Sequence, residues 1–385
     1  MIFAFLVRLP FMMITGVRYD WWWYAHDGSN IAKGHKPFVD FSFYGHNCVP
    51  PGYLIVVTSF YILVKSFGFS VDSFFYNFSM KSWMVFGDIA CVYLVYHICL
   101  SLNLGEEKSK IASIIVAFNP YMAFESAWQG HFDSIVAASL LAGVYFALKG
   151  RSFLSGLVLS IGFLIKMIPA IGLILIFKFK RYSEKGKFVL GFFSLIALIY
   201  AVFIWWIGSL SFILDPIRYH GSRTDYLNET NKTATYFFFL YITNSFDELA
   251  IYVQDVWLFF AVPLLSYLAW RYHKMNDEEE IFKGVFFLTA GLIATMKFIN
   301  PQYLVWILPF MTIYMVMKPD KLREYSYWFL VFWFIFWAGT LIKFLKPVTG
   351  IIFLPALLVF FFPKNLKQVY LKLRTQIIPQ KSIGK

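Results

Sequence analysis

Three polar residues at the edges of long apolar runs have the types needed for acid–base chemistry. Asp20 follows the first apolar run, and His131 and Asp133 stand between two later runs. A charge beside lipid is costly, so such residues are candidates for a functional site. A carboxylate at this position can act as a general base that takes the proton from an attacking hydroxyl. We therefore predict Asp20 as the base, with His131 and Asp133 orienting a sugar or a phosphate.

Four cationic side chains lie at similar edges and suit the binding of a phosphate leaving group: Arg18, Lys166, Arg223 and Lys297. Charge on a departing phosphate must be neutralised as its bond breaks. Lysine supplies a point charge for this purpose, and arginine a bidentate clamp. The alternative for Lys166 and Lys297 is a side chain that only reaches toward the membrane surface.

The same residues also have structural interpretations. Asp20 can pair with Arg18 inside a belt of interfacial aromatic residues. Asp133 can cap the helix that it begins. His131 has no comparable structural role in an interfacial turn. Tyr24 and Gln302 complete the predicted donor- and sugar-binding set.

No cofactor is required by these residues, although a divalent metal remains open, with Asp40 and Asp133 as weak candidate ligands. The three cysteines have no metal-ligand spacing. The chain has no phosphate-cradling glycine loop and no dinucleotide fingerprint, which argues against nucleotide-driven chemistry.

The elements that must position these groups are membrane helices. Of the 385 residues, 59% are hydrophobic and 22% aromatic. About 20 apolar residues span a bilayer, and this length predicts an all-α polytopic membrane protein with ~11–13 spans. Residues 1–17 form the predicted first span, and 152–164 with 166–178 form a short pair that turns near Lys166. The other apolar runs are 81–101, 111–127, 132–148, 188–208, 252–270, 281–296, 302–317, 325–345 and 347–362.

The formal net charge of +12 comes from basic clusters in the loops and in the tail. Basic loops favour the cytoplasmic side of a membrane protein, and this orientation accounts for the positive charge. We therefore expect no nucleic-acid partner. The resulting topology gives one integral-membrane domain over 1–363 and a basic cytoplasmic tail over 364–385. Two large outer loops are predicted, at 18–79 and 209–255.

Residues 50–67 allow two topologies. Either this run spans the bilayer, or it lies in the outer interface as part of the 18–79 loop. Only the second option places Asp20, His131 and Lys297 on one side of the membrane. The run is barely long enough to span, and the segment after it is aromatic and nearly free of positive charge, so the second option is favoured.

These motifs, in this order, resemble the GT-C superfamily of integral-membrane glycosyltransferases. The nearest likenesses are the first mannosyltransferase of GPI-anchor synthesis and the prokaryotic mannosyltransferases that use polyprenol-phosphate mannose. The resemblance covers roughly residues 15–310. It is carried by Arg18-Tyr19-Asp20, Gly34-His35-Lys36-Pro37, Trp128-Gln129-Gly130-His131-Phe132-Asp133, Ser155-Gly156 and Lys297 to Trp306.

The resemblance implies an inverting transfer on the outer or lumenal face, with Asp20 as the base and interfacial helices in the first loop. The GPI-anchor enzymes carry Asp-x-Asp in that loop. Here Trp22 stands at the second position, and Asp27 and Asp40 lie at other spacings.

We therefore predict a glycosyltransferase that moves a hexose, with mannose as first candidate, from a polyprenyl (dolichol-type) phosphate donor to a lipid-linked or glycan acceptor. The expected location is a prokaryotic plasma membrane or an ER-like internal membrane. The alternative is a polytopic transporter or a flippase for lipid-linked oligosaccharides, which also places polar residues within spans but usually shows inverted repeats.

Overall fold

The protein is an all-α membrane protein, seen here in a computed structural model that describes residues 1–14, 16, 18–37, 40, 50–210, 213, 256–275, 277–295 and 301–318. The described residues belong to two compact units. The larger unit holds those within 1–223, 263–290 and 300–326, and it contains every contact discussed below. The smaller unit is described only at 256–262 and 291–295.

The described elements are α-helices with three helical segments of other types. In chain order they are α1 (Ile2–Met12), α2 (Arg18–Ala32), α3 (Pro51–Ser66), α4 (Phe74–Ser101), α5 (Glu106–Ala117), α6 (Pro120–Ala123), the π-helix η1 (Phe124–Gln129), α7 (Asp133–Leu148), α8 (Ser152–Phe163), the 3₁₀-helix η2 (Ile168–Lys178), α9 (Tyr182–Ile207), α13 (Val256–Tyr272), α14 (Glu278–Thr295), the 3₁₀-helix η5 (Pro301–Trp306) and α15 (Leu308–Met317).

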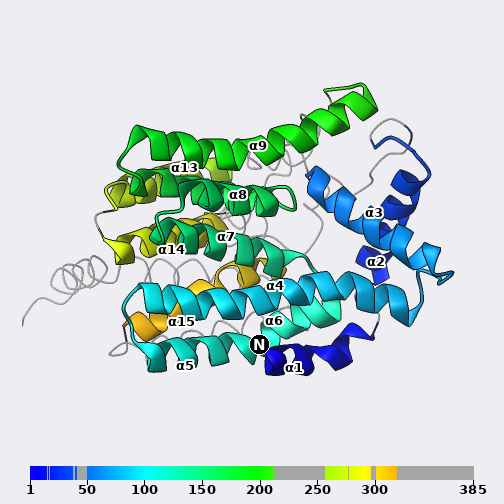
Figure 1. Cartoon of the computed structure of the whole chain (residues 1–385), viewed down its shortest axis with the longest axis horizontal. Coiled ribbons are helices and arrows are strands. Elements are labelled where there is room, and N and C mark those ends of the chain that lie inside the picture. The colour runs from blue at the N-terminus through cyan, green and yellow to red at the C-terminus, as the bar shows by residue number, and fades with distance from the viewer. Residues whose placement is uncertain are drawn as a thin grey trace, which may run out of the picture. The chain divides into compact units, whose positions relative to one another are not determined.

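Two of the described helices, α4 and α9, are long and apolar enough to cross a membrane. They have 28 and 26 residues, and six shorter apolar helices accompany them. Helices α4, α5, α7, α8 and α9 lie side by side with nearly parallel axes (Figure 1). These elements confirm the predicted apolar runs over 81–101, 132–148 and 188–208. The predicted turn near Lys166 is also confirmed, between α8 and η2.

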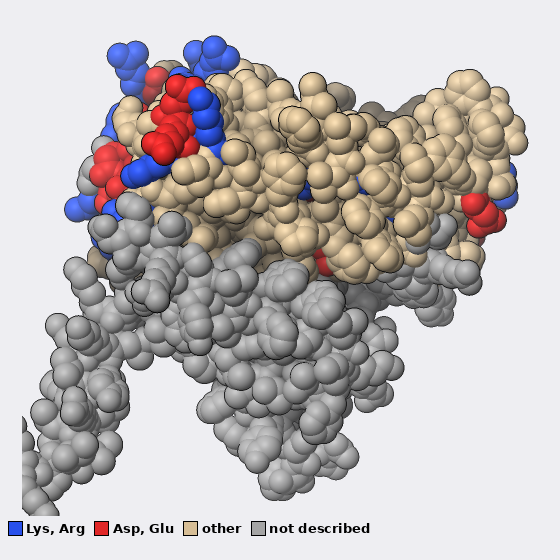
Figure 2. Space-filling model, turned by 90° about the horizontal axis from the view of Figure 1, so that it is seen from below, with Lys and Arg blue, Asp and Glu red and all other residues tan. Residues whose placement is uncertain are grey.

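Most of the described loop charges gather at one end of this bundle, whereas Lys33 and Lys36 follow α2 and Lys65 lies in the last turn of α3. His97 of α4 contacts Tyr145 of α7, so both helices finish at the same end. Lys180 donates a hydrogen bond to the carbonyl of Lys274, and Asn103 contacts Glu278, which adds the loops before α9 and α14 to that end. Figure 2 shows most of the charged side chains of the visible face at one end, a broad surface with few charges beyond them, and a small charged group at the opposite end. The turns that carry His131 and Lys166 lie at the opposite ends of α7 and α8.

Three predicted segments differ from the structure, and one of them is the run 302–317, which is divided into η5 and α15. The run 111–127 is not one helix, because Pro120 cannot donate a backbone hydrogen bond and Asn119 caps a new turn with its side chain. The first helix is also shorter than predicted. Helix α1 has 11 residues, or ~16 Å of length at 1.5 Å per residue, about half of a bilayer core.

Helix α3 contacts the site end of the bundle at both of its termini. The backbone N–H of Tyr53 donates to the carbonyl of Leu164, in the turn between α8 and η2. After the last turn of α3, Phe67 and Phe69 pack on Phe75 in the first turn of α4. The helix therefore starts and finishes near the same end of the larger unit.

Candidate active site

The first cluster of the site is a histidine held between two carboxylates. Nε2 of His131 lies 3.1 Å from Oδ2 of Asp20, and Nδ1 lies 2.7 Å from Oε2 of Glu125. The three side chains are mostly buried, with exposed fractions of 10%, 19% and 4%. Ionised carboxylates only accept hydrogen bonds, so both ring nitrogens donate and the ring is an imidazolium.

The protonation of His131 follows from its two partners. Burial alone lowers the pKa of an imidazole, because it disfavours the charged form. The hydrogen bonds to Asp20 and Glu125 act in the opposite direction and raise the pKa of His131 to about 10. The ring is therefore protonated at both nitrogens and cationic at neutral pH. With ionised carboxylates, the cluster has one positive and two negative charges.

The π-helix η1 places Glu125 and His131 together. In this geometry the backbone N–H of His131 reaches the carbonyl of Glu125 at 2.9 Å, while the two side chains meet as well. Gly130 between them adopts φ +80°, a left-handed conformation that glycine accepts without strain. Single π-turns are rare and frequently occur at functional sites.

Helix α2 brings Asp20 to this turn through two aromatic neighbours. One turn after Asp20, the hydroxyl of Tyr24 donates to the carbonyl of Gly130 at 3.2 Å. Trp21 packs against Gly130 so closely that a Cβ atom there would lie 2.8 Å from Cζ2 of the indole. Asp20 is thus held by its own helix and by the turn that it faces.

The second cluster forms around Asp133 at the start of α7. Nζ of Lys166 donates to both carboxylate oxygens at 2.8 Å, and Nε1 of Trp306 donates to Oδ1 at 2.6 Å. The ammonium also lies 5.5 Å from the ring centre of Tyr303 and 5.7 Å from that of Trp306. Asp133 is 1% exposed, whereas the Lys166 side chain is 24% exposed, so part of the lysine side chain is accessible.

A single short turn therefore joins the two clusters. His131 and Asp133 are separated only by Phe132, and they contact different partners. His131 faces the carboxylate from α2, and Asp133 faces the ammonium that follows α8. The turn thus contacts two carboxylates through His131 and one ammonium through Asp133.

Lys81 of α4 connects the end of α1 to the π-helix that precedes His131. Its buried ammonium donates to the carbonyl of Trp128 at 2.7 Å. It also donates to the carbonyl of Phe11, in the last turn of α1, and to that of Ile14, which follows this helix. The residues that lead into α2 and those that lead into His131 therefore share one lysine. The same ammonium lies 5.5 Å from the ring centre of Trp21.

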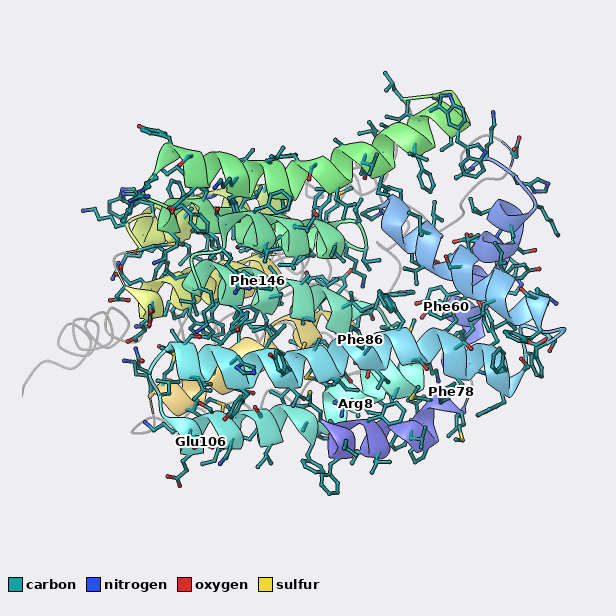
Figure 3. The ribbon with its side chains drawn as sticks, in the orientation of Figure 1. Arg8, Phe60, Phe78, Phe86, Glu106 and Phe146 are labelled. Atoms are coloured by element: carbon teal, nitrogen blue, oxygen red, sulfur yellow. The ribbon has the colours of Figure 1, made fainter. Side chains whose placement is uncertain are left out.

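A buried ion pair lies deeper between α1 and α4. Nε of Arg8 is 2.5 Å from Oδ2 of Asp88, and both side chains are 0% exposed. The guanidinium also donates to the carbonyl of Ala117, and Ser126 of η1 donates to the same carboxylate. Figure 3 shows Arg8 beside α4 in the bundle. The pair ties α1, α4 and η1 together.

A further carboxylate, Asp27, lies two turns after Asp20 on α2. It is fully buried and accepts a hydrogen bond from the hydroxyl of Tyr53 at 3.3 Å, with Nδ1 of His26 at the same distance. Burial raises the pKa of Asp27 to about 7, although the Tyr53 hydrogen bond acts against the rise. This group titrates near neutrality and is separate from the His131 cluster.

The structure brings together only part of the predicted residue set. Asp20, His131, Asp133, Lys166 and Tyr24 meet at the turn described above. Gln302 lies in η5 beside Tyr303, and Arg18 begins α2 with its side chain outside the described part. The remaining calls fall on residues that the structure does not describe: Arg223, Lys297, most of the 209–255 loop, the first residues of the run 252–270, the runs 325–345 and 347–362, and the tail.

The candidate metal ligands do not gather. Asp40 accepts a hydrogen bond from the backbone N–H of Lys36, 2.6 Å away in its own turn. Asp133 is paired with Lys166. Within the described ranges, no group of three or more histidine, cysteine or acidic side chains is arranged to hold a metal ion.

Sequence reasoning missed Glu125, Lys81 and the pair of Arg8 with Asp88. Arg8, Asp88 and Glu125 stand inside apolar runs and Lys81 begins one, where an ionisable residue is a functional hypothesis by default. For Arg8, Asp88 and Glu125 the signal was therefore present within the runs, whereas the predicted residues were taken from their edges.

The comparison with protein families decides the class of the protein. The model of glycosyltransferase family 87 matches residues 50–296. The chain belongs to glycosyltransferase family 87. This match covers Glu125, His131, Asp133 and Lys166, whereas Asp20 precedes it. No curated protein matches the chain.

Membership of family 87 makes the protein a membrane glycosyltransferase, which needs a sugar donor and an acceptor. It favours this interpretation over a transporter or a flippase. The two clusters now have a chemical context, because sugar transfer requires a base for the attacking hydroxyl and stabilisation of the leaving group.

Proposed function

We propose that the protein transfers a hexose, with mannose as first candidate, from a polyprenyl-phosphate donor to a lipid-linked or glycan acceptor, and that Asp20 is the general base. The observation that carries the proposal is the turn shared by both clusters. His131 binds the carboxylate that would take the proton, and two residues later Asp133 binds the ammonium that would face the phosphate.

In this reaction the acceptor oxygen attacks the anomeric carbon of the donor. Its proton passes to the Asp20 carboxylate. The bond between the anomeric carbon and the phosphate oxygen breaks, and its electron pair leaves with the polyprenyl phosphate. A single displacement of this kind inverts the anomeric centre. Lys166 neutralises the charge that develops on the phosphate.

Lys166 is suited to this role by its surroundings. Asp133 and the rings of Tyr303 and Trp306 fix the ammonium, and a quarter of its side chain remains exposed. A donor phosphate would add a second anionic partner to it. We assign Arg18, Arg223 and Lys297 to the same phosphate, and Tyr24 and Gln302 with His131 to the sugar, as further parts of the proposal.

The distribution of charge supports a site on the outer or lumenal face. Most of the described basic loops gather at the end of the bundle opposite to the turn of His131, and the exceptions are Lys33, Lys36 and Lys65 of the 18–79 segment. Basic loops favour the cytoplasmic side. Because α3 contacts the site end at both termini, we propose that it lies in the interface with α2 as part of an outer loop over 18–79.

The proposal is tested with purified protein in lipid vesicles. Labelled polyprenyl-phosphate mannose and the matching glucose donor serve as probes, and lipids and glycans extracted from the source membrane serve as acceptors. Asp20→Asn should lower the transfer rate at least ~100-fold, the lower range for a general base. Asp72→Asn, at an exposed carboxylate before α4, is the matched control. A folded Asp20→Asn protein with full activity would contradict the proposal.

A further inference from the structure

The side chain of Glu125 has no place in the proposed reaction, yet it is the most buried member of the first cluster. It is 4% exposed and contacts Nδ1 of His131 at 2.7 Å, a shorter distance than that between His131 and Asp20. An ionised carboxylate in such surroundings is costly unless it is paired. The pairing with His131 removes this cost, and it also places a second negative charge beside the imidazole that Asp20 contacts.

We infer that Glu125 is a positioning residue, whose negative charge compensates the imidazolium of His131 and so preserves the basicity of Asp20. The inference rests on the proposed function, in which Asp20 accepts the proton of the attacking hydroxyl. Glu125 itself does not touch the reacting atoms. It acts through the imidazole.

The charge count of the cluster gives the physical reason. With His131 protonated, the two carboxylates and the imidazolium carry a net charge of one negative unit. Once Asp20 takes a proton, the imidazolium and Glu125 remain as a neutral pair. Without Glu125, an imidazolium next to Asp20 would already be neutralised, and proton uptake by Asp20 would leave an unpaired buried cation. Glu125 thus makes protonation of Asp20 favourable in a buried site.

The other ionisable groups near His131 do not replace this charge. Tyr24 comes from α2 and Tyr121 from α6, and both are neutral as phenols. Asp133 is compensated by Lys166. The ammonium of Lys81 is directed at backbone carbonyls. Among the described residues, the carboxylates in hydrogen-bond contact with His131 are Asp20 and Glu125.

Local structure also fixes Glu125 for this role. The backbone of His131 donates to the Glu125 carbonyl, so ring and carboxylate are joined through the main chain as well as through their side chains. The next residue, Ser126, donates to the buried Asp88. The backbone that carries the Glu125 side chain is therefore held in place at its own carbonyl and at the following residue.

The test compares Glu125→Gln and Glu125→Asp with the wild-type protein, using the full chain in lipid nanodiscs. Glutamine keeps the shape and the acceptor oxygen but removes the charge, whereas aspartate keeps the charge. Nitrogen NMR of ¹⁵N-labelled histidine reports the protonation of each imidazole, and His131→Asn identifies the signal among the seven histidines. The same preparations are assayed for sugar transfer with labelled polyprenyl-phosphate mannose.

In E125Q we expect the titration midpoint of His131 to fall by at least about one pH unit, which is a tenfold change in proton affinity. The turnover number should fall about 10- to 100-fold, with a smaller change in the KM for the donor. E125D should lie closer to the wild type in both measurements. A purely structural role would lower the amount of folded protein without moving the titration.

The inference is overturned if E125Q leaves the His131 titration within about 0.3 units of the wild type, or if E125Q transfers sugar at the wild-type rate. Should E125Q not fold, E125D decides, because it keeps the charge, and a loss of transfer there with an unchanged His131 titration would overturn the inference. Failure of the proposed function has a different signature. It would show as no transfer by the wild type or as full activity of Asp20→Asn, neither of which depends on the NMR result.

Discussion

Gly130 and Trp21 are packed with no room for a side chain between them. A Cβ atom on Gly130 would lie 2.8 Å from Cζ2 of the indole, and the backbone there has φ +80°. Trp21 adjoins Asp20, and Gly130 adjoins His131. The contact therefore sets how closely the base approaches the imidazole.

Gly130→Ala should reduce both stability and transfer. A left-handed backbone costs a non-glycine residue ~1–2 kcal/mol, and the clash with Trp21 adds to this cost. Gly208→Ala is the matched control, because Gly208 has φ +79° in the same left-handed region and nothing lies within 4 Å of the place that an added methyl group would take. Thermal unfolding in detergent and the transfer assay should show a larger effect at Gly130. Equal effects at both positions would contradict the role of the Trp21 contact.

Trp306→Phe should weaken the second cluster. The variant keeps an aromatic ring beside Lys166 but removes the hydrogen bond to the buried Asp133. Hydrogen bonds to charged groups contribute ~1.5–3 kcal/mol, and we expect a loss of unfolding free energy in this range. Trp205→Phe, at a tryptophan that is 84% exposed, should change it by less than ~0.5 kcal/mol. Denaturant titration distinguishes the two, and a Trp306→Phe protein as stable as the wild type would refute the expectation.

Removal of one member of the Arg8–Asp88 pair should be more harmful than removal of both. Arg8→Met leaves a buried carboxylate without its cation, which costs ~3–5 kcal/mol. Arg8→Met combined with Asp88→Met replaces the pair by apolar side chains and should recover part of that loss. Unfolding measurements on the single and double variants form the test. A double variant that is less stable than Arg8→Met would show that the pair is not coupled as described.

Asp27 should make stability depend on pH between about 4 and 7. Burial raises its pKa from 3.8 to about 7, so in this window the folded protein binds a proton that the unfolded chain has lost. The stability that this proton provides is complete below pH 3.8 and is lost as the pH rises through 7. The slope is at most ~1.4 kcal/mol per pH unit. Asp27→Asn should flatten the profile in this window, whereas Asp72→Asn, at an exposed position, should keep its slope.

The helices of the larger unit were predictable because a helix in the hydrocarbon core of a bilayer needs a long apolar run in the sequence. The run 132–148 matches α7 closely, whereas α9 begins six residues before the run 188–208. The break at Asn119-Pro120 and the π-helix after it were not predicted, since apolar composition does not reveal which backbone hydrogen bonds are made. Those features decide where Glu125 and His131 point.

The site was predictable by residue type but not by pairing. Asp20, His131, Asp133 and Lys166 were selected as isolated candidates for the base, the sugar and the phosphate. That Asp133 holds Lys166, and that Glu125 holds His131, depends on contacts that apolar composition does not encode. A search for opposite charges inside apolar runs would have found Arg8, Lys81, Asp88 and Glu125, because buried charges need partners.

The three carbonyl contacts of Lys81 connect the first fourteen residues to the candidate site. Two of the acceptors, from Phe11 and Ile14, belong to the first fourteen residues, and the third belongs to Trp128. Deleting those residues for expression or tagging would leave a buried ammonium with a single acceptor. The damage would then reach Asp20 and His131 together, so a tag is best added ahead of an intact Met1.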